Sequence, residues 1–106
     1  MLARSDLLGF AQDWISRKQA VFAELGISSE VELSPPDRDP RSVSWVFEGP
    51  FHGGQIVIWA DGQSEMDLAD MESGEIRSEH RWIESEIVLI SILGSIYNWV
   101  TGIDSL

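Results

Sequence analysis

The Asp61-Gly62 pair constrains the fold of this chain more than any other short segment. An Asp-Gly pair between alternating apolar segments is the strongest local signal for a β-hairpin. Residues 55–60 before the pair are mostly apolar, and residues 63–69 after it alternate, with Met66 and Leu68 pointing to the same side. The centre of the chain therefore predicts two antiparallel strands with a shared buried face.

Further strands are predicted on both sides of this hairpin. Residues 42–48 alternate as a strand does, and residues 76–82 form a last strand or an extended segment. Residues 31–33 indicate a short edge strand, whereas the prolines of residues 34–40 exclude a central strand and indicate a loop. A turn is expected over residues 49–54, because this segment contains three glycines and a proline.

Helices are predicted at both ends of the chain. Apolar residues recur at helical spacing over residues 5–25, where Ser5 can cap the N-terminus and Gly26 the C-terminus. A second apolar stripe spans about residues 84–100 and ends before Gly102.

These elements predict a two-layer α+β architecture. Residues 1–106 are expected to form a single domain with an N-terminal helix, an antiparallel β-meander of three to five strands and a C-terminal helix. Both helices are expected to pack on one face of the sheet. Most of the five tryptophans, Trp59 among them, are expected in the core, and Gly9 is expected to mark a close packing contact.

Charge and composition exclude several classes of function. The net charge of −11 disfavours binding to nucleic acid or to an anionic membrane and favours a basic protein partner. The absence of cysteine excludes disulfides, thiolate metal sites and a cysteine nucleophile. The longest apolar stretch, residues 87–100, is too short and too polar to span a bilayer, and no signal peptide is apparent. A soluble cytoplasmic protein is expected.

An acidic run covers the hairpin and the segment after it. The run contains one base, Arg77, and seven carboxylates: Asp61, Glu65, Asp67, Asp70, Glu72, Glu75 and Glu79. Two interpretations are open. Strand residues that face solvent are often charged and oppose edge aggregation. Alternatively, like charge that repels itself is retained because a basic partner docks there. We take these seven residues as the candidate partner-binding site.

The sequence offers little for catalysis or metal binding. Neither His52 nor His80 lies beside a nucleophile motif, and there is no phosphate-binding loop. Glu79-His80 and the nearby carboxylates could supply ligands, but they lack the spacing of a known metal motif. Glu65 and Asp67 could share a face for acid–base chemistry, as residues two apart on any strand do. We therefore expect no enzyme activity, no metal and no cofactor.

The central segment resembles a known family. Residues 45–48, residues 55–62 with the Trp-x-Asp-Gly hairpin, residues 65–67 and residues 78–80 are similar to the TriTu-type immunity proteins of bacterial polymorphic toxin and contact-dependent growth inhibition systems. The resemblance covers about residues 43–82, and the helices match in placement.

The resemblance implies a cytoplasmic antitoxin. Such a protein would bind the C-terminal domain of a cognate toxin one to one, be a monomer when free, and make no direct contact with nucleic acid or membrane. Many such toxins are nucleases, and the acidic run would block the basic site of such a toxin. Two alternatives remain at this point: an acidic secretion chaperone for an effector protein, and a carboxylate- or metal-dependent hydrolase.

Overall fold

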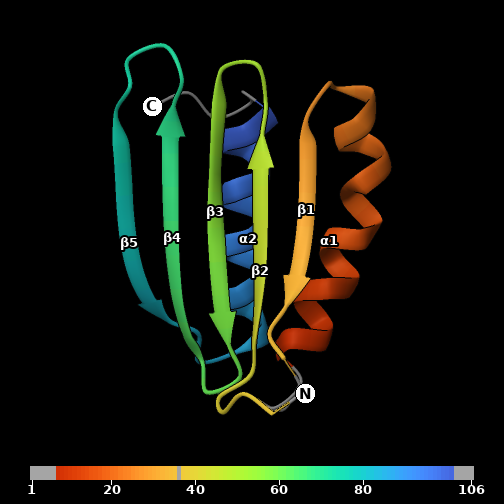
Figure 1. Ribbon diagram of the computed structural model, residues 1–106, viewed down its shortest axis with the longest axis vertical. Coiled ribbons are helices and arrows are strands. Elements are labelled where there is room, and N and C mark those ends of the chain that lie inside the picture. Colours follow the sequence, from red (N-terminus) through yellow and green to blue (C-terminus); the bar gives the residue numbers. More distant parts are fainter. Residues whose placement is uncertain (1–6, 36, 102–106) are drawn as a thin grey trace.

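The computed structural model describes residues 7–35 and 37–101, which form two helices and five strands (Figure 1). Their order is α1 (Leu7–Glu24), β1 (Ser28–Leu33), β2 (Ser42–Glu48), β3 (His52–Trp59), β4 (Gln63–Asp70), β5 (Ile76–Trp82) and α2 (Glu86–Thr101). The strands form one antiparallel sheet in the order β1-β2-β3-β4-β5. The predicted α+β meander is confirmed, with five strands. Ser5 and Gly102, which were expected to cap the helices, lie outside the described residues.

The predicted hairpin joins β3 to β4 through a loop of three residues. Gly62 N–H donates to the Trp59 carbonyl at 3.0 Å, and Gly62 has a φ of 102°. Such a loop needs a left-handed residue at its last position, and glycine adopts that conformation without strain. Strand β3 therefore ends one residue earlier than the sequence suggests.

Strand β3 also begins earlier than predicted. Gly53 and Gly54 pair with Glu48 and Phe47 of β2 and so belong to the strand, not to the turn. A Cβ at Gly54 would lie 3.1 Å from the Phe47 ring and would collide with the Asp67 carbonyl oxygen. Glycine is therefore used here for close packing within the sheet, a role that turn statistics do not reveal.

Helix α1 ends as its glycine predicts. Gly26 has a φ of 74°, its N–H donates to the Ala23 carbonyl, and Ile27 N–H donates to the Phe22 carbonyl at 2.8 Å. These two bonds form a Schellman motif, and the accompanying apolar contact is supplied by Phe22 and Ile27, both buried. The expectation for Gly9 is wrong, because no atom lies within 4 Å of a Cβ placed there.

Two glycines provide a matched stability test. A Cβ would meet no atom within 4 Å at Gly26 or at Gly94, so only the backbone conformation distinguishes the two sites. We expect Gly26→Ala to lower the free energy of unfolding by about 1 kcal/mol, because φ is positive there. We expect Gly94→Ala, inside α2, to raise it by roughly 0.5–1 kcal/mol. Urea unfolding of both variants would measure this difference, and equal effects would contradict it.

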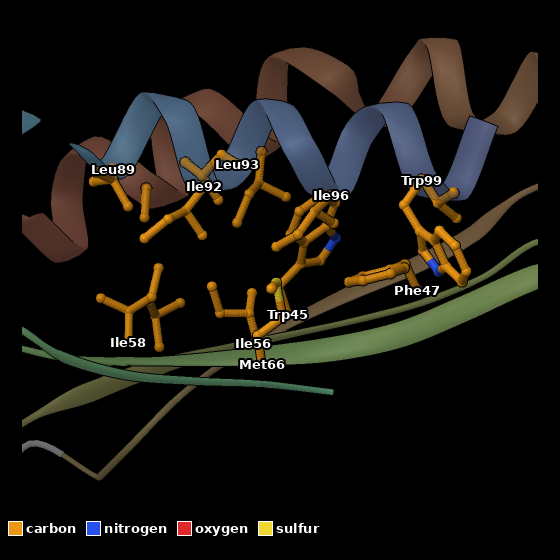
Figure 2. Packing of buried hydrophobic residues seen from close by; sticks show 14 of the residues in the cluster. Trp45, Phe47, Ile56, Ile58, Met66, Leu89, Ile92, Leu93, Ile96 and Trp99 are labelled. Carbon is orange, nitrogen blue, oxygen red and sulfur yellow. The ribbon is translucent and has the colours of Figure 1, made fainter. Parts of the chain in front are cut away.

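The core lies between the sheet and the two helices. Trp45 is 1% exposed and stacks on Phe22 of α1 with ring centroids 5.6 Å apart. Figure 2 shows side chains of α2, including Leu93 and Ile96, pointing at the sheet residues Ile56 and Ile58. Two buried indoles donate hydrogen bonds: Trp45 of β2 donates to the Ser29 hydroxyl, and Trp99 of α2 donates to the Gly53 carbonyl. The core is therefore large and rich in aromatic rings, and these two buried indole N–H groups have hydrogen-bond acceptors.

Both helices pack on the same face of the sheet, as predicted. In Figure 1, α2 lies behind β2 and β3, and α1 lies beside β1. None of the described helices is long and apolar enough to cross a membrane. Neither of the described helices covers the opposite face of the sheet, and antiparallel sheets commonly keep one face in water.

Candidate functional site

We call the side of the sheet that the helices leave uncovered the open face. Residues paired directly across an antiparallel sheet point to the same side, so the register defines its members. From β1 to β5 they are Ser28, Glu30, Glu32, Ser42, Ser44, Val46, Glu48, Gln55, Val57, Trp59, Gln63, Glu65, Asp67, Ala69, Ile76, Ser78, His80 and Trp82.

The open face is acidic without compensating bases. It carries five carboxylates, and the described strands contribute no lysine or arginine to it: the carboxylates are Glu30, Glu32, Glu48, Glu65 and Asp67. Within the described residues the one salt bridge is between Arg17 and Asp13, on α1. The charge of this face is therefore available to a basic partner.

The register arranges most of these carboxylates in two rows. One row runs from Glu30 on β1 to Asp67 on β4, and the other from Glu32 to Glu65. Neighbouring strands lie about 4.8 Å apart, so each row spaces its two carboxylates by roughly 14 Å. The strip between them, on β2 and β3, is uncharged and includes Val46 and Val57. Repulsion across the strip is weak, since this spacing exceeds the screening length of about 8 Å at physiological salt. Repulsion is stronger between Glu30 and Glu32 and between Glu65 and Asp67, which lie two residues apart on one strand, about 7 Å.

Asp67 is the one carboxylate of the open face held in a side-chain network across three strands. It accepts hydrogen bonds from the Ser78 hydroxyl of β5 and from Gln55 Nε2 of β3, the latter at 3.1 Å. These bonds stabilise the ionised form, Ser78 most, and lower the pKa of Asp67 below its ordinary value of 3.8 although partial desolvation opposes them. Asp67 therefore stays charged in mild acid.

This network predicts how Asp67 affects stability as the pH changes. Because folding lowers its pKa, the carboxylate stabilises the folded state above pH 3.8, and this contribution is lost as the pH falls through the folded pKa. We expect Asp67→Asn to lower the thermal midpoint at neutral pH, and the difference in midpoint between variant and wild type to disappear below pH 3.8. Thermal scans at a series of pH values measure this difference. Glu65→Gln is the control, because the Glu65 side chain makes no hydrogen bond among the described residues. If Glu65→Gln showed the same pH-dependent difference in midpoint, the hydrogen bonds of Asp67 would not be its cause.

Apolar side chains make the open face suitable for protein contact as well as for charge. Val46 is 48% exposed and Trp82 is 53% exposed. Trp59 shares their side, at the same end of the sheet as Trp82, and is half-buried outside the core cluster. The expectation that Trp59 is a core residue is therefore wrong, because strand alternation puts Ile56 and Ile58 inside instead. Exposed tryptophan beside charge is typical of contact surfaces.

Two residues of the predicted site shape turns. Asp61 accepts from Gln63 N–H at 3.0 Å and from Gln63 Nε2 at 2.8 Å, within the β3–β4 hairpin. Asp70 accepts from the N–H groups of Glu72 and Ser73 at the other end of β4. Aspartates in such positions fix turns through their side chains. The two lie at opposite ends of an eight-residue strand, roughly 26 Å apart.

The remaining predicted residues lie elsewhere. Glu72 is exposed in the β4–β5 turn, and Glu75 precedes β5. Glu79 lies on the helix side of β5, since it pairs with the buried Met66. Of the seven carboxylates that are contiguous in sequence, the structure thus brings together on the open face only Glu65 and Asp67.

The residues considered for metal binding do not converge. Glu79 and His80 are adjacent on β5 and so point to opposite sides of the sheet. Over residues 7–35 and 37–101, no group of three or more histidine or carboxylate side chains is placed to hold a metal ion. A hollow beside Glu65, Asp67, Ser78 and His80 of the open face also reaches Glu79 at the β5 edge, and its walls offer carboxylates to a cationic group.

Three carboxylates of the open face were not predicted from the sequence. Glu30, Glu32 and Glu48 lie on β1 and β2, upstream of the acidic run, and only the sheet order brings them to the same side as Glu65 and Asp67. Alternation within residues 42–48 could have indicated Glu48, which lies opposite in phase to Val43, Trp45 and Phe47.

A family model matches most of the chain. A family model described as Immunity protein TriTu matches residues 9–99, from α1 to near the end of α2. The match confirms the resemblance of the central segment and extends it to both helices. No curated protein matches the chain.

Proposed function

Because this chain belongs to the TriTu family of immunity proteins, we propose that it binds and neutralises a cognate toxin through the open face. The toxin domain is the C-terminal domain of a contact-dependent growth inhibition or related polymorphic effector, and each chain binds one toxin domain. Binding takes place in the cytoplasm of the protected cell and involves no catalysis.

The observation that carries this proposal is the charge of the open face. This surface, which no described element covers, carries five carboxylates and no lysine or arginine. It also carries the exposed side chains of Val46 and Trp82. Charge of one sign steers an oppositely charged partner and raises the association rate, while the apolar residues add affinity once contact is made. A basic toxin surface is the complement of such a face.

We further propose that the toxin is a nuclease. A nuclease binds phosphates with lysine and arginine side chains, so its substrate site is basic. The two rows of carboxylates lie about 7 Å apart, and the two carboxylates within each row lie roughly 14 Å apart; they would take the place of backbone phosphates on such a site. Of the residues first predicted, Glu65 and Asp67 are proposed as direct contacts. Asp61, Asp70, Glu72, Glu75 and Glu79 are then proposed for the edges of the interface.

The test is co-expression with the reading frame immediately upstream in the source genome. We expect the C-terminal domain of that product to be toxic alone, to be tolerated with this chain, and to copurify with it. A nuclease assay on the purified toxin domain, with and without this chain, then tests the mode of inhibition. A harmless upstream product that forms no complex would overturn the proposal. A toxic product that is not a nuclease would overturn only the choice of toxin class.

A further inference from the structure

Strand β5 forms an open edge of the sheet. All seven of its residues are exposed, with Ile76 at 70%, and β4 is the only described strand that pairs with it. An exposed edge of this length presents unpaired backbone groups and is a ready template for another strand. The chain therefore has to block this edge or use it.

The backbone groups on that edge can be assigned. Asp70 N–H donates to the Glu75 carbonyl at 2.9 Å, and Ile83 N–H donates to the Gly62 carbonyl at 2.7 Å. Both bonds continue the β4–β5 register, and both make the odd-numbered residues of β5 the ones that bond to β4. Antiparallel ladders alternate between bonded and non-bonded pairs. The peptide groups that point away from β4 are consequently those of Ile76, Ser78, His80 and Trp82.

The helix side of this edge carries charges of alternating sign. The residues are Glu75, Arg77, Glu79 and Arg81. Arg77, Glu79 and Arg81 line a groove against Ile92 and Trp99 of α2, and Glu75 and Arg77 line a neighbouring hollow against Trp99. On the open-face side, β5 contributes no carboxylate, lysine or arginine. The edge is thus close to neutral in a strongly acidic chain.

We propose that β5 pairs with β5 of a second copy of this chain, antiparallel and with the two-fold axis at Ser78. In this register Ser78 lies opposite Ser78 of the second copy, and Ile76 lies opposite His80. The outward peptide groups of Ile76, Ser78 and His80 then complete their hydrogen bonds. Arg77 lies opposite Glu79 of the second copy, and Glu75 lies opposite Arg81.

Charge alternation selects this register over its neighbours. All four charged residues meet an opposite charge, in non-bonded pairs where Cα atoms are only about 4.5 Å apart. A shift of the axis by one residue, to Glu79, would put Glu79 against Glu79 and Arg77 against Arg81. Charges on an edge commonly prevent pairing. Here their alternation disfavours that shifted register but permits pairing about Ser78.

The carboxylates of the open face add little repulsion to this pairing. The carboxylate of the open face nearest to the axis is Asp67 on β4. Across the dimer its two copies are three strand spacings apart, about 14 Å, beyond the screening length of about 8 Å at physiological salt. Pairing uses the edge and leaves the open face uncovered, so this inference does not rest on the proposed contacts of Glu65 and Asp67; Glu75 and Glu79, proposed for the edge of the toxin interface, are the residues that both proposals use. It differs from the monomer expected from sequence because β5 becomes an edge only in the folded sheet.

Single cysteines test the register, since the chain has no cysteine of its own. In Ser78→Cys the two Cα atoms would be about 5.5 Å apart, which suits a disulfide. In the control His80→Cys the two cysteines would be offset by four residues, about 13 Å. Under mild oxidation we expect Ser78→Cys to give mostly covalent dimer and His80→Cys mostly monomer on a non-reducing gel. Equal yields from both, or none from Ser78→Cys, would overturn the register.

A charge swap tests the pairing itself. Light scattering and sedimentation of the wild type should show a dimer that dissociates on dilution. Arg77→Glu turns two opposite-charge pairs into like-charge pairs, and we expect the dimer dissociation constant to rise at least about tenfold. Combining it with Glu79→Arg restores all four opposite pairs, and dimerisation should return. A wild type that is monomeric at every concentration, or a double variant that stays monomeric, would overturn the proposal.

Toxin binding is measured separately on Arg77→Glu. Arg77→Glu leaves every residue of the open face in place, so the proposed toxin contact should persist in the monomeric variant. Loss of the dimer with retained toxin binding supports both proposals. A stable dimer that binds no toxin would overturn the proposed function alone.

Discussion

Replacing Trp45 by alanine is expected to lower the free energy of unfolding by about 3–5 kcal/mol. The indole is 1% exposed, stacks on Phe22 at 5.6 Å, and contacts Phe47 at 4.8 Å and Trp14 at 6.2 Å between ring centroids. Its removal leaves a cavity where α1 meets the sheet and leaves the Ser29 hydroxyl without its donor. The total free energy of unfolding of a domain of this size is only about 5–15 kcal/mol. The thermal midpoint should therefore fall by roughly 15 °C or more.

Trp82→Ala is the matched control for this prediction. It makes the same substitution at an indole that is 53% exposed on the open face, and we expect a change within about 0.5 kcal/mol. Calorimetry or urea unfolding of both variants gives the comparison. If the two variants unfolded alike, Trp45 would not be the centre of the core.

Reversing four carboxylates of the open face is expected to slow toxin association by a factor of ten to a thousand. The four are Glu30, Glu32, Glu65 and Asp67, each changed to lysine. All are on a surface without lysine or arginine, so the substitution replaces attraction to a basic partner with repulsion. Because encounter rates depend on long-range fields, the loss should be greatest at low salt and should shrink as salt is added.

The control changes the net charge equally at exposed carboxylates off the open face. These are Glu24, Asp37, Asp39 and Glu84, again changed to lysine. Surface plasmon resonance at two salt concentrations gives the association rates, and thermal scans verify that both variants fold. We expect the control set to keep most of the wild-type rate. Equal losses in the two sets would mean that net charge, and not this face, directs the toxin.

Local sequence patterns were sufficient for the architecture. The Asp61-Gly62 pair, the Schellman glycine Gly26 and the alternation of residues 42–48 and 63–69 each act through neighbours in the chain. Their interpretation needs no knowledge of distant contacts, and both helices and all five strands were predicted. The boundaries of β1 and β3 were missed, since Ser28 and Gly53 become strand residues only by pairing with β2.

The sequence by itself thus determined the elements, their order and the acidity of the chain. The tertiary structure alone decided which carboxylates share a surface. Alternation within β4 and β5 sends Glu65 and Glu79 to opposite sides, and turns carry Asp61 and Asp70 to opposite ends. Pairing of β1 with β2 brings in Glu30 from far upstream. The physical reason is that a side chain in a sheet has its neighbours set by strand register, and register is fixed by contacts between segments distant in sequence.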